Sequence, residues 1–464
     1  MQAPQQPAGQ ASVDPGIFRA YDIRGVVGEN LSAEVARSIG HGIASRMADG
    51  GERRIAVARD GRLSSPELTA ALIEGLRAGG RDVVDLGQVP TPVLYFATHD
   101  LEDLNSGVMV TGSHNPPDYN GFKLVIGGDT LFGDDIEDIR RRIPEDPPDG
   151  NGTLEQVDIS SRYLDAVTES TGPLTRPLRV VVDAGNGVAG ELAPQVFRRL
   201  GCEVDELYTE IDGHFPNHHP DPGEPENLVD LIARVRETRA DIGFGFDGDG
   251  DRVGVITPAG ELIYPDHLMM AYAEDLLSRE PGARILFDVK CTGNLERVIR
   301  EHGGTPEMYR TGHSLIKARM RESGALLAGE MSGHIFFGEH WYGFDDGLYA
   351  AARLAAILAG AGEDADAFFE RFPRDYSTPE ISIPVPEERK FEVVERLARE
   401  GDFGDGRRIT LDGIRVDYED GWGLCRASNT SPKLVARYEG QTPEALERIR
   451  ARFEQAIEKA LASY

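Results

Sequence analysis

The segment TGSHNPPDYNGFK, residues 111–123, follows an apolar run at positions 107–110 and extends into a second one at positions 122–126. Runs of this length, bounded by glycine and proline, predict short strands. The glycine and the proline pair inside the segment exclude an immediate helix, so we expect Ser113 and His114 to lie on a sharp, exposed turn. The two strands would form a hairpin that gathers a hydroxyl, an imidazole and an ammonium around one point.

Two interpretations of this segment stay open on its residues alone. One is an ordinary hairpin with a polar tip, in which Asn120-Gly121 turns the chain back. The other is a loop that carries a reactive group. Ser113 and His114 do not by themselves indicate a nucleophile and its base, because adjacent side chains usually point apart. A hydrolase triad is therefore not indicated.

Helices and strands alternate before this hairpin. We expect an amphipathic helix over 32–47, a buried strand over 55–58, a helix whose N-cap is Ser65, and a strand over 83–86. This alternation predicts a mixed α/β domain that ends near the linker 144–152, which is rich in proline, glycine and aspartate.

Two further cycles of the same kind follow. The second contains strands over 178–182 and 242–246, and the third contains a strand over 284–289 and a polar turn over 329–334. Three blocks of similar length, each with a short polar loop, predict three related α/β domains whose loops converge on one cleft.

The last part of the chain has a different pattern. Residues 372–386 are rich in proline and predict a domain boundary. A small α+β domain follows, whose final helix is expected to begin after Thr442 and to run to Leu461. Between them lies the cluster RASNT, residues 426–430. Its residue types suit a phosphate site, and a surface turn is the alternative.

The segment DGDGDR, residues 247–252, is the strongest chemical signal. Alternate residues of an extended segment point to one side, so Asp247, Asp249 and Asp251 would offer three carboxylates to one divalent cation. The alternative is a solvated acidic turn, although three charges this close would repel one another without a cation. A dinucleotide site is excluded because no helix follows, and an EF-hand is excluded because Arg252 stands where glycine is required.

Length and composition indicate a soluble multidomain enzyme. At 464 residues the chain exceeds one hydrophobic core, and about three or four domains are expected. No apolar run is long enough to span a bilayer. Residues 1–17 are expected to be a disordered tail and not a signal peptide. The cysteines Cys202, Cys291 and Cys425 lack paired spacing, which indicates a reducing cytoplasm and no metal–thiolate site.

The chain is strongly acidic, with 79 acidic against 49 basic residues and a formal net charge of −30. This charge argues against nucleic acid as a partner. Only six of the basic residues are lysines. Adaptation to high salt and the codon usage of a GC-rich genome are both consistent with this composition.

Residues 111–123 closely resemble the active-site serine loop of the α-D-phosphohexomutases, in particular the bacterial phosphomannomutase/phosphoglucomutase branch. The resemblance extends from about Phe18 to Leu461. It implies that Ser113 carries a phosphoryl group in the resting enzyme. It also implies that Mg²⁺ is held by Asp247, Asp249, Asp251 and an oxygen of the phosphorylated serine.

The resemblance implies further catalytic residues. Lys123 and Arg252 would steady the phosphoryl oxygens. His334 is the preferred group for acid–base work on the sugar hydroxyl, with Lys123 as the other candidate. His114, beside the serine, belongs to the same catalytic set.

Substrate-binding residues also follow from the resemblance. GEMSGH, residues 329–334, is similar to the family's sugar-binding loop, and Met331 favours this branch over the phosphoglucosamine mutases, which typically have glutamine there. RASNT is similar to the family's phosphate-binding loop. The positions that match substrate contacts are Tyr21, Arg24, Lys290, Gly312, His313, Glu330, Ser332, His334, Arg426, Ser428, Asn429 and Thr430.

We therefore expect an α/β protein with three related mixed α/β domains plus a smaller C-terminal α+β domain around a central cleft. The expected bounds are a tail over 1–17, a serine-loop domain over 18–158, a metal-loop domain over 159–261, a sugar-loop domain over 262–373 and a phosphate-loop domain over 374–464.

The expected activity is reversible transfer of phosphate between C1 and C6 of mannose phosphate and glucose phosphate, through phospho-Ser113 and a hexose 1,6-bisphosphate. Mg²⁺ is the expected metal, and glucose 1,6-bisphosphate is the expected activator and intermediate. The product would supply sugar nucleotides for polysaccharide synthesis. The alternatives are a phosphoglucosamine mutase, a metal-dependent phosphosugar phosphatase and a non-catalytic phosphosugar-binding protein. We expect phosphosugars as partners, neither nucleic acid nor membrane, and a cytoplasmic monomer.

Overall fold

The structure is a computed structural model that describes residues 13–144, 146, 148–429 and 431–462. It divides into two compact units. Unit 1 contains the residues up to Val253 and the segment Asp346–Ala352, and unit 2 contains Gly254–Asp345 and the residues from Arg353 onward. Among the described residues, no helix combines the length and the apolar character that crossing a membrane requires.

Unit 1 begins with a mixed sheet of strand order β1-β5-β4-β2-β3-β7, in which β6 pairs with β5. Strands β4, β2 and β3 are parallel neighbours, and β5 runs antiparallel to β4. The strands are β1 (Ile23–Val26), β2 (Arg54–Arg59), β3 (Asp82–Gln88), β4 (Gly107–Val110), β5 (Tyr119–Ile126), β6 (Asp129–Thr130) and β7 (Leu154–Gln156).

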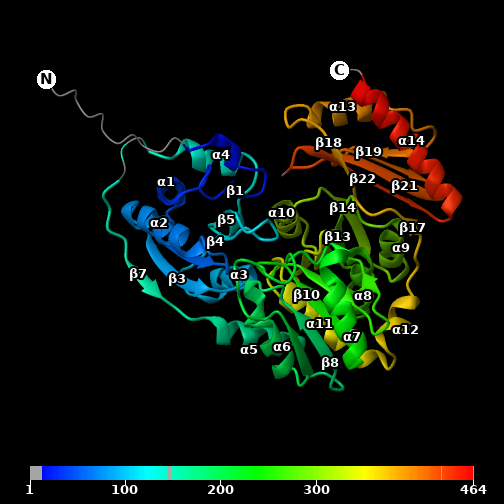
Figure 1. Cartoon of the computed structure of the whole chain (residues 1–464), viewed down its shortest axis with the longest axis horizontal. Coiled ribbons are helices and arrows are strands. Elements are labelled where there is room, and N and C mark those ends of the chain that lie inside the picture. Colours follow the sequence, from blue (N-terminus) through cyan, green and yellow to red (C-terminus); the bar gives the residue numbers. More distant parts are fainter. Residues whose placement is uncertain (1–12, 145, 147, 430, 463–464) are drawn as a thin grey trace. The chain divides into compact units, whose positions relative to one another are not determined.

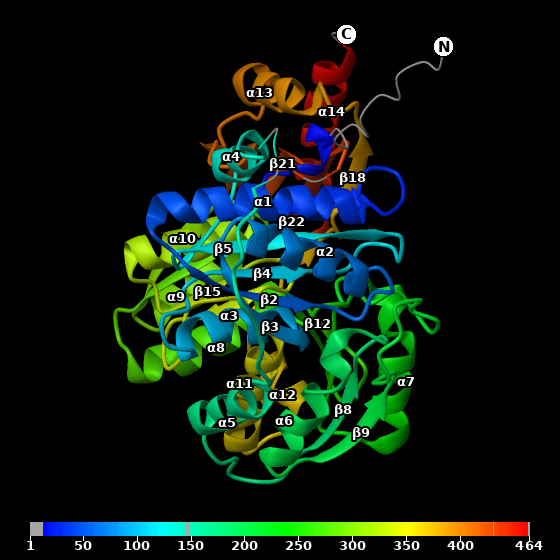
Figure 2. The ribbon, with the colours of Figure 1, turned by 90° about the vertical axis from the view of Figure 1, so that its left-hand side faces the viewer.

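Helices cover both sides of this first sheet. Figure 1 shows α1 (Ala33–Gly50) and α2 (Ser65–Ala78) on one side and α3 (Thr91–Asp100) on the other. The helix α4 (Asp134–Arg141) packs with α1, and Figure 2 shows α1 running in roughly the same direction as β4 and β5. In α1, buried Val35, Ile39, Ile43 and Met47 recur every four residues. This spacing gives the helix one apolar stripe toward the core.

The second sheet has the order β12-β11-β10-β8-β9, with β10, β8 and β9 parallel. Its strands are β8 (Arg179–Asp183), β9 (Glu203–Leu207), β10 (Ile242–Phe246), β11 (Val253–Ile256) and β12 (Leu262–Ile263). The helices of this region are α5 (Ser160–Thr171), α6 (Ala193–Arg199) and α7 (Val229–Thr238), with short 3₁₀ turns η2 (Val188–Gly190) and η3 (Pro225–Leu228).

Unit 2 contains a third sheet of order β14-β13-β15-β16. Its strands are β13 (Arg284–Asp288), β14 (Thr305–Tyr309), β15 (Leu327–Gly329) and β16 (Ile335–Phe337), and its helices are α8 (Pro265–Arg279), α9 (Gly293–Glu301), α10 (His313–Ser323) and α12 (Ala365–Glu370). The boundary between the units falls inside α11 (Gly347–Ala361). Arg353 is the charged residue in the otherwise largely apolar sequence of that helix. It is buried, and its ion pairs with Glu339 and Asp275 neutralise its charge.

The three sheets share one strand order. The order is common to four successive strands that begin at β2, β8 and β13: the first of the four is central, the second flanks it on one side, the third flanks it on the other side, and the fourth lies beyond the third. The serine loop, the DGDGDR loop and the GEMSGH loop each connect the third strand to the fourth. The prediction of three related α/β domains is therefore confirmed, and the three motifs occupy equivalent places in the fold.

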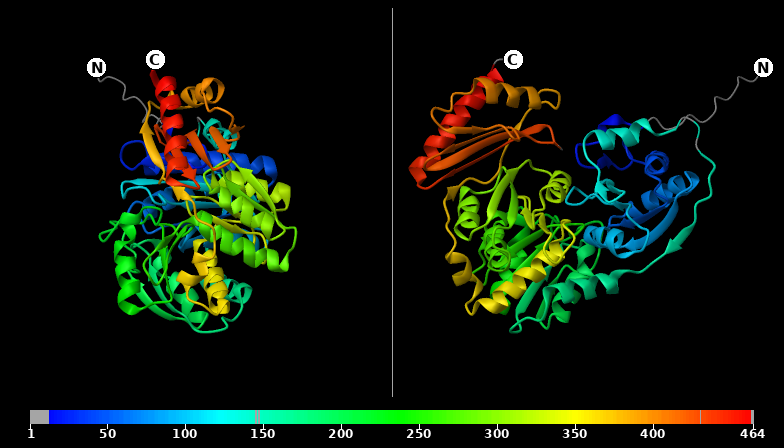
Figure 3. Two further views of the ribbon diagram at one scale, coloured as in Figure 1. Left: turned by 90° about the vertical axis from the view of Figure 1, so that its right-hand side faces the viewer. Right: turned by 180° about the vertical axis from the view of Figure 1, so that it is seen from behind.

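The C-terminal domain is an antiparallel sheet of order β17-β22-β21-β20-β19, in which β18 also pairs with β22. Its elements are β17 (Tyr376–Ser377), β18 (Ile381–Pro384), α13 (Lys390–Glu400), β19 (Arg407–Ile409), β20 (Ile414–Tyr418), β21 (Gly421–Ala427), β22 (Lys433–Gly440) and α14 (Pro443–Ala462). Both helices pack on one face of the sheet (Figure 3), where Phe403 and Phe453 meet with ring centroids 4.6 Å apart. The predicted small α+β domain is confirmed.

Four local expectations differ from the structure. The N-cap of α2 is Ser64, because the hydroxyl of Ser65 is buried and donates to Asp60. Asn120-Gly121 lies inside β5, since the reversal is completed by residues 111–118. The stretch 372–386, expected to be a linker at a domain boundary, still precedes the C-terminal domain but contains its edge strands β17 and β18, where proline is tolerated. The predicted tail is too long, because Pro15–Ile17 form a capped 3₁₀ turn η1 with Ile17 in the core; residues 1–12 lie outside the described part.

Candidate active site

Ser113 lies between β4 and β5 in a backbone conformation that few non-glycine residues adopt. Its φ of 48° is in the left-handed region, and strain of this kind concentrates at functional sites. Its amide donates to Oγ1 of Thr111 at 2.8 Å. Ser113 is only 4% exposed, so the prediction of an exposed turn is wrong for the serine, whereas neighbouring His114 is exposed.

A buried guanidinium holds the serine loop in place. Nη2 of Arg62 donates to the carbonyl oxygens of Ser113 at 2.7 Å and Asn115 at 2.6 Å. Nη1 donates to the carbonyl oxygen of Tyr119 at 3.0 Å. A Cβ atom at Gly112 would lie 2.4 Å from the guanidinium carbon. The close approach therefore requires glycine, and the arginine fixes the strained turn through its backbone.

Asp60 ties the same loop to the sheet. Its Oδ2 accepts hydrogen bonds from Oγ1 of Thr111 at 2.8 Å and from the amide of Gly112 at 3.1 Å. Asp60 and Arg62 follow β2, which is the parallel neighbour of β4, so both loops leave the sheet at one edge. The sequence RDGR directly after a buried strand was the available signal, but its use depends on knowing which strands are neighbours.

Arg24, on β1, also bonds the serine loop. Its Nη1 donates to the carbonyl oxygen of Gly112 at 2.7 Å, and its guanidinium also bonds the side chains of Asp22 and Asn115. Tyr21 lies just before this strand and is half-buried. The predicted substrate residue Arg24 is thus brought to the serine loop of unit 1.

The acidic loop after β10 forms a buried group of carboxylates. Asp247, Asp249 and Asp251 are fully buried, and their ligand oxygens all lie within 4.8 Å of one another. Burial, with the charges of Asp249 and Asp251, raises the pKa of Asp247 to about 8. Oδ1 of Asp249 is buried and accepts no hydrogen bond from the described residues. This donor set fits a hard divalent cation, and the alternative of a solvated acidic turn is wrong.

The serine and the carboxylate group are in direct contact. Oγ of Ser113 donates to Oδ2 of Asp247 at 3.1 Å and lies 3.3 Å from Nδ1 of His114. The expectation that the adjacent serine and histidine side chains point apart is therefore wrong. Because φ of Ser113 is positive, the alternation of side chains that holds in an extended segment does not apply to this turn.

Lys123 neutralises part of the acidic group. Its Nζ lies 2.7 Å from Oδ2 of Asp249 and also pairs with Asp251. Oγ1 of Thr91 donates to the same Oδ2 atom of Asp249 at 2.5 Å. Burial alone would raise the pKa of Asp249, but the ammonium and these hydrogen bonds lower it far below its usual range. Asp249 is therefore charged while Asp247 is held in its neutral form near neutral pH.

Arg252 is a fixed cation beside the same group. Its Nε donates to Oδ2 of Asp247 at 3.1 Å, and its Nη1 lies 3.3 Å from Oδ1 of Asp221. Although burial opposes the charged form, Asp221 and Asp247 raise the pKa of Arg252 further. Asp221, which sequence reasoning missed, orients this guanidinium.

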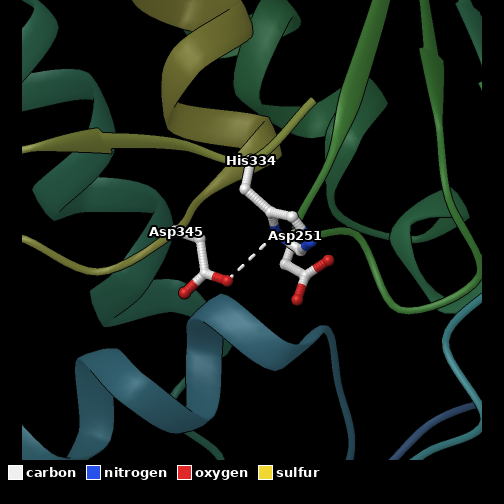
Figure 4. Close-up of side chains that lie close together, drawn as sticks. All are labelled: Asp251, His334 and Asp345. Carbon is white, nitrogen blue, oxygen red and sulfur yellow. Dashed lines mark ion pairs between the residues drawn. The ribbon is translucent and has the colours of Figure 1, made fainter. Parts of the chain in front are cut away.

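In unit 2, His334 is paired with Asp345 (Figure 4), with Nδ1 and Oδ2 3.1 Å apart. Nζ of Lys317 donates to Oδ1 of that carboxylate at 2.7 Å, and Nδ1 of His313 lies 3.6 Å from Oδ2. Burial would raise the pKa of Asp345, but Lys317 and the two histidines lower it well below its usual range. Because Nδ1 of His334 faces this ionised carboxylate, the arrangement favours the proton on Nδ1 and leaves Nε2 as the basic nitrogen of a neutral His334.

The GEMSGH turn meets the start of α10. The buried carboxylate of Glu330 accepts a hydrogen bond from the amide of Gly312, the residue before α10. Burial raises the pKa of Glu330 to about 7, although His334 opposes the shift. Ser332 is half-buried in the turn. The predicted sugar residues Glu330, Gly312 and His334 are thus neighbours within unit 2.

Two cations predicted to contact substrate, Lys290 and the phosphate-loop residue Arg426, each face a carboxylate. Nζ of Lys290, the second residue after β13, lies 2.7 Å from Oε1 of Glu380 and 3.9 Å from Oδ2 of Asp288. Arg426, in β21, donates through Nε to Oδ2 of Asp412 at 3.0 Å. Both cations are buried.

The turn after β21 carries the remaining phosphate candidates. Ser428 is buried, and Asn429 is half-buried. The amide of Ser428 donates to the carbonyl oxygen of Lys433 at 2.9 Å, and its Oγ accepts from the amide of Ser431 at 3.2 Å. Thr430, also predicted here, lies outside the described residues.

Two groups of predicted residues emerge, one within each unit. Unit 1 gathers Ser113, His114, Lys123, Arg24, Asp247, Asp249, Asp251 and Arg252. Unit 2 gathers His313, His334, Glu330 and Gly312, and places Lys290 and Arg426 opposite carboxylates. The contacts that sequence reasoning missed come from Asp60, Arg62, Thr91, Asp221, Lys317, Asp345, Glu380 and Asp412.

Four family profiles match successive parts of the chain. They describe phosphoglucomutase/phosphomannomutase alpha/beta/alpha domain I, which matches residues 15–148, domain II, which matches 161–260, domain III, which matches 264–376, and the C-terminal domain, which matches 380–456.

Individual relatives share most of the chain. A phosphomannomutase/phosphoglucomutase from Pseudomonas aeruginosa is 58% identical over 438 residues, which cover 94% of each protein. A phosphoglucomutase from Neisseria gonorrhoeae is 50% identical over 97% of this chain and 98% of the relative. A crystal structure of a phosphoglucomutase/phosphomannomutase family protein from Burkholderia thailandensis superposes with a TM-score of 0.91 at 52% identity, covering 97% of this chain and 98% of that chain.

Proposed function

This chain belongs to the phosphoglucomutase/phosphomannomutase family, and from that premise we propose that Ser113 carries a phosphoryl group and exchanges it with both ends of a hexose phosphate. The family membership expected from the serine loop is confirmed, as is the enzyme class, an isomerase that acts on hexose phosphates. The roles of individual residues are the proposal.

One observation carries the assignment of the nucleophile. Oγ of Ser113 donates to Oδ2 of Asp247 at 3.1 Å, so the strained serine lies against the carboxylate group that fits a divalent cation. A serine held this way combines a reactive hydroxyl with charge neutralisation at the phosphoryl group. This is the combination that phosphoryl transfer requires.

We propose Mg²⁺ for the donor set formed by Asp247, Asp249, Asp251 and an oxygen of phosphorylated Ser113. When bound, Mg²⁺ neutralises charge on the phosphoryl group. Lys123 and Arg252 contribute fixed cations beside the same carboxylates. Because both side chains are already positioned, little reorganisation is needed when charge shifts during transfer.

His334 is the proposed acid–base group for the sugar hydroxyl. Nδ1 of His334 lies 3.1 Å from the carboxylate of Asp345, which favours the proton on Nδ1, so Nε2 would take the hydroxyl proton as the oxygen attacks, and return it in the reverse direction. Lys123 is the weaker candidate, since pairing with two carboxylates stabilises its charged form. His114, 3.3 Å from Oγ of Ser113, would exchange the serine proton.

The residues of unit 2 are proposed to bind the rest of the substrate. Glu330 and Ser332 would contact sugar hydroxyls. The phosphate that is not being transferred would be held by Lys290, Arg426, Ser428, Asn429 and Thr430, with Tyr21, Arg24, Gly312 and His313 as further substrate contacts. A hexose 1,6-bisphosphate formed in the first transfer would then turn over and return its other phosphate to Ser113.

This scheme explains how one serine and one phosphate-binding site serve both half-reactions. Glucose 1,6-bisphosphate is accordingly proposed as both intermediate and activator, because it would phosphorylate an enzyme molecule whose Ser113 carries no phosphoryl group. Mannose and glucose phosphates are the proposed substrates, supported by relatives named phosphomannomutase/phosphoglucomutase. We propose that the products supply sugar nucleotides. Three buried free cysteines support a reducing compartment.

A coupled assay with glucose 1-phosphate and with mannose 1-phosphate tests the function. We expect formation of the 6-phosphate from both sugars, with kcat/KM values within about tenfold of each other, since a group that the site does not hydrogen-bond gives little discrimination. Inorganic phosphate should stay far below product. Release of phosphate equal to turnover would identify a phosphatase and contradict the proposal.

A further inference from the structure

We propose that Glu380 is a built-in counter-ion, which occupies the ammonium of Lys290 when no ligand is bound and competes there with the phosphate of the substrate. This inference rests on the proposed function, which assigns Lys290 to substrate binding. It adds a residue that sets the affinity for phosphate and lies outside the four sequence motifs.

The environment of Lys290 requires a counter-ion. Its side chain is 7% exposed, and a buried ammonium without an opposite charge is costly. Nζ of Lys290 lies 2.7 Å from Glu380 but 3.9 Å from Asp288. Asp288 is also engaged elsewhere, since its Oδ2 accepts from Oγ1 of Thr311 at 2.9 Å. The direct counter-ion of Lys290 is therefore Glu380.

The two partners differ in how easily they can leave the pair. Glu380 lies between the short strands β17 and β18, and its side chain is 38% exposed. It can turn into solvent and exchange the ammonium for water. Lys290 cannot do so, because it is enclosed at the end of β13. An incoming anion would therefore displace the glutamate and leave the lysine in place.

The cations around Glu380 suit a phosphate as well as a carboxylate. Partial burial would raise the pKa of Glu380, but Lys290, Arg437 and Arg426 lower it. Several cations around a single carboxylate make the charge set that binds a phosphate dianion. In this arrangement Glu380 stands in for the substrate phosphate, and both anions cannot share Lys290 because like charges this close repel one another.

Competition of this kind predicts a measurable cost in affinity. Only molecules whose Lys290 is released from Glu380 can bind the anion. The apparent Kd therefore equals the intrinsic Kd divided by the fraction of molecules in which Lys290 is released. Removing the carboxylate should tighten the binding of glucose 6-phosphate and inorganic phosphate by about fivefold, the ratio expected for an ion pair with one exposed partner. The ligand-free protein should lose stability, because Lys290 then lacks its direct counter-ion.

The test compares Glu380→Gln and Glu380→Asp with wild type by calorimetric titration of glucose 6-phosphate and of inorganic phosphate, with ligand-free Tm as a second readout. Glu380→Asp keeps the net charge but shortens the side chain, so it separates direct contact from overall charge. Glu387→Gln is the matched control. Glu387 is another glutamate of the C-terminal domain that pairs with a lysine, its Oε1 lying 2.6 Å from Nζ of Lys390.

We expect tighter binding and a lower ligand-free Tm for Glu380→Gln, an intermediate effect for Glu380→Asp, and no change in affinity for Glu387→Gln. Equal or weaker binding by Glu380→Gln, in protein that still interconverts hexose phosphates, would overturn the counter-ion proposal alone. Equal tightening by Glu387→Gln would show a general charge effect and overturn it as well. If wild type binds neither ligand, the role proposed for Lys290 fails together with this inference.

Discussion

Nζ of Lys123 lies 2.7 Å from Oδ2 of Asp249, and the same ammonium also pairs with Asp251. These groups are buried, so a lysine from the serine-loop hairpin supplies positive charge to the proposed metal ligands. The serine loop and the acidic loop are thereby joined electrostatically as well as through Ser113. Loss of this lysine should leave excess negative charge that only another cation can neutralise.

We therefore expect Lys123→Met to destabilise the metal-free protein by about 3–5 kcal/mol, the usual cost of removing one partner of a buried ion pair. Mg²⁺ should restore more of the Tm in this variant than in wild type, because it neutralises the same carboxylates. Arg437→Met is the control, since it likewise removes the cation of a buried ion pair, the one with Asp266. An equal gain with Mg²⁺ in both variants would contradict the assignment of the metal ligands.

The raised pKa of Asp247, about 8 against an ordinary 3.8, predicts a pH dependence. Between these two values the metal-free protein binds a proton that the unfolded chain has released, so this group makes stability fall as pH rises through that window. A cation bound at the carboxylates must expel this proton. We expect about one proton released per Mg²⁺ near pH 7, and none well above pH 8.

Titration calorimetry in two buffers with different ionisation enthalpies measures this release. Asp247→Asn, which has no proton to lose, should abolish the dependence of the heat on the buffer. Proton release that is unchanged in this variant would assign the titration to another group.

Arg62→Met should disorder the serine loop without unfolding the sheet, because its guanidinium bonds the carbonyl oxygens of Ser113 and Asn115. We expect kcat to fall by about a hundredfold, since small misplacements of reacting groups have effects of this size. Hydrogen exchange over residues 111–118 should become faster. The surface arginine Arg37, paired with Glu74, is the control, and Arg37→Met should leave both readouts unchanged.

How much of the site could be predicted depended on whether its signal was local in the sequence. Asp247, Asp249 and Asp251 alternate within five residues, so strand geometry alone put them on one side. Ser113 stood out through the glycine and prolines around it. Local rules failed where tertiary contacts decide the conformation, as at Ser65, whose hydroxyl bonds Asp60 and does not cap the helix.

The supporting residues were missed because their partners are distant in sequence. Arg62 acts on a loop about fifty positions later, and Asp221 reaches Arg252 from another loop. Glu380 meets Lys290 only because the C-terminal domain packs against Val289, the residue after β13. Each contact depends on strand register or domain packing, which periodicity does not encode. The strand order common to the three sheets links their motifs, and it became visible only in the fold.

The central claim is that Ser113 is the residue that carries the phosphoryl group, and phosphopeptide mass spectrometry tests it most directly. Purified enzyme is incubated with glucose 1,6-bisphosphate, digested and mapped, and a second portion is chased with excess glucose 6-phosphate before digestion. We predict one phosphoryl group on the peptide that contains Ser113, lost in the chase as the bisphosphate forms again, and no modification of Ser113→Ala. An unmodified Ser113 in a preparation that interconverts hexose phosphates, or loss of the label as inorganic phosphate, would contradict the account.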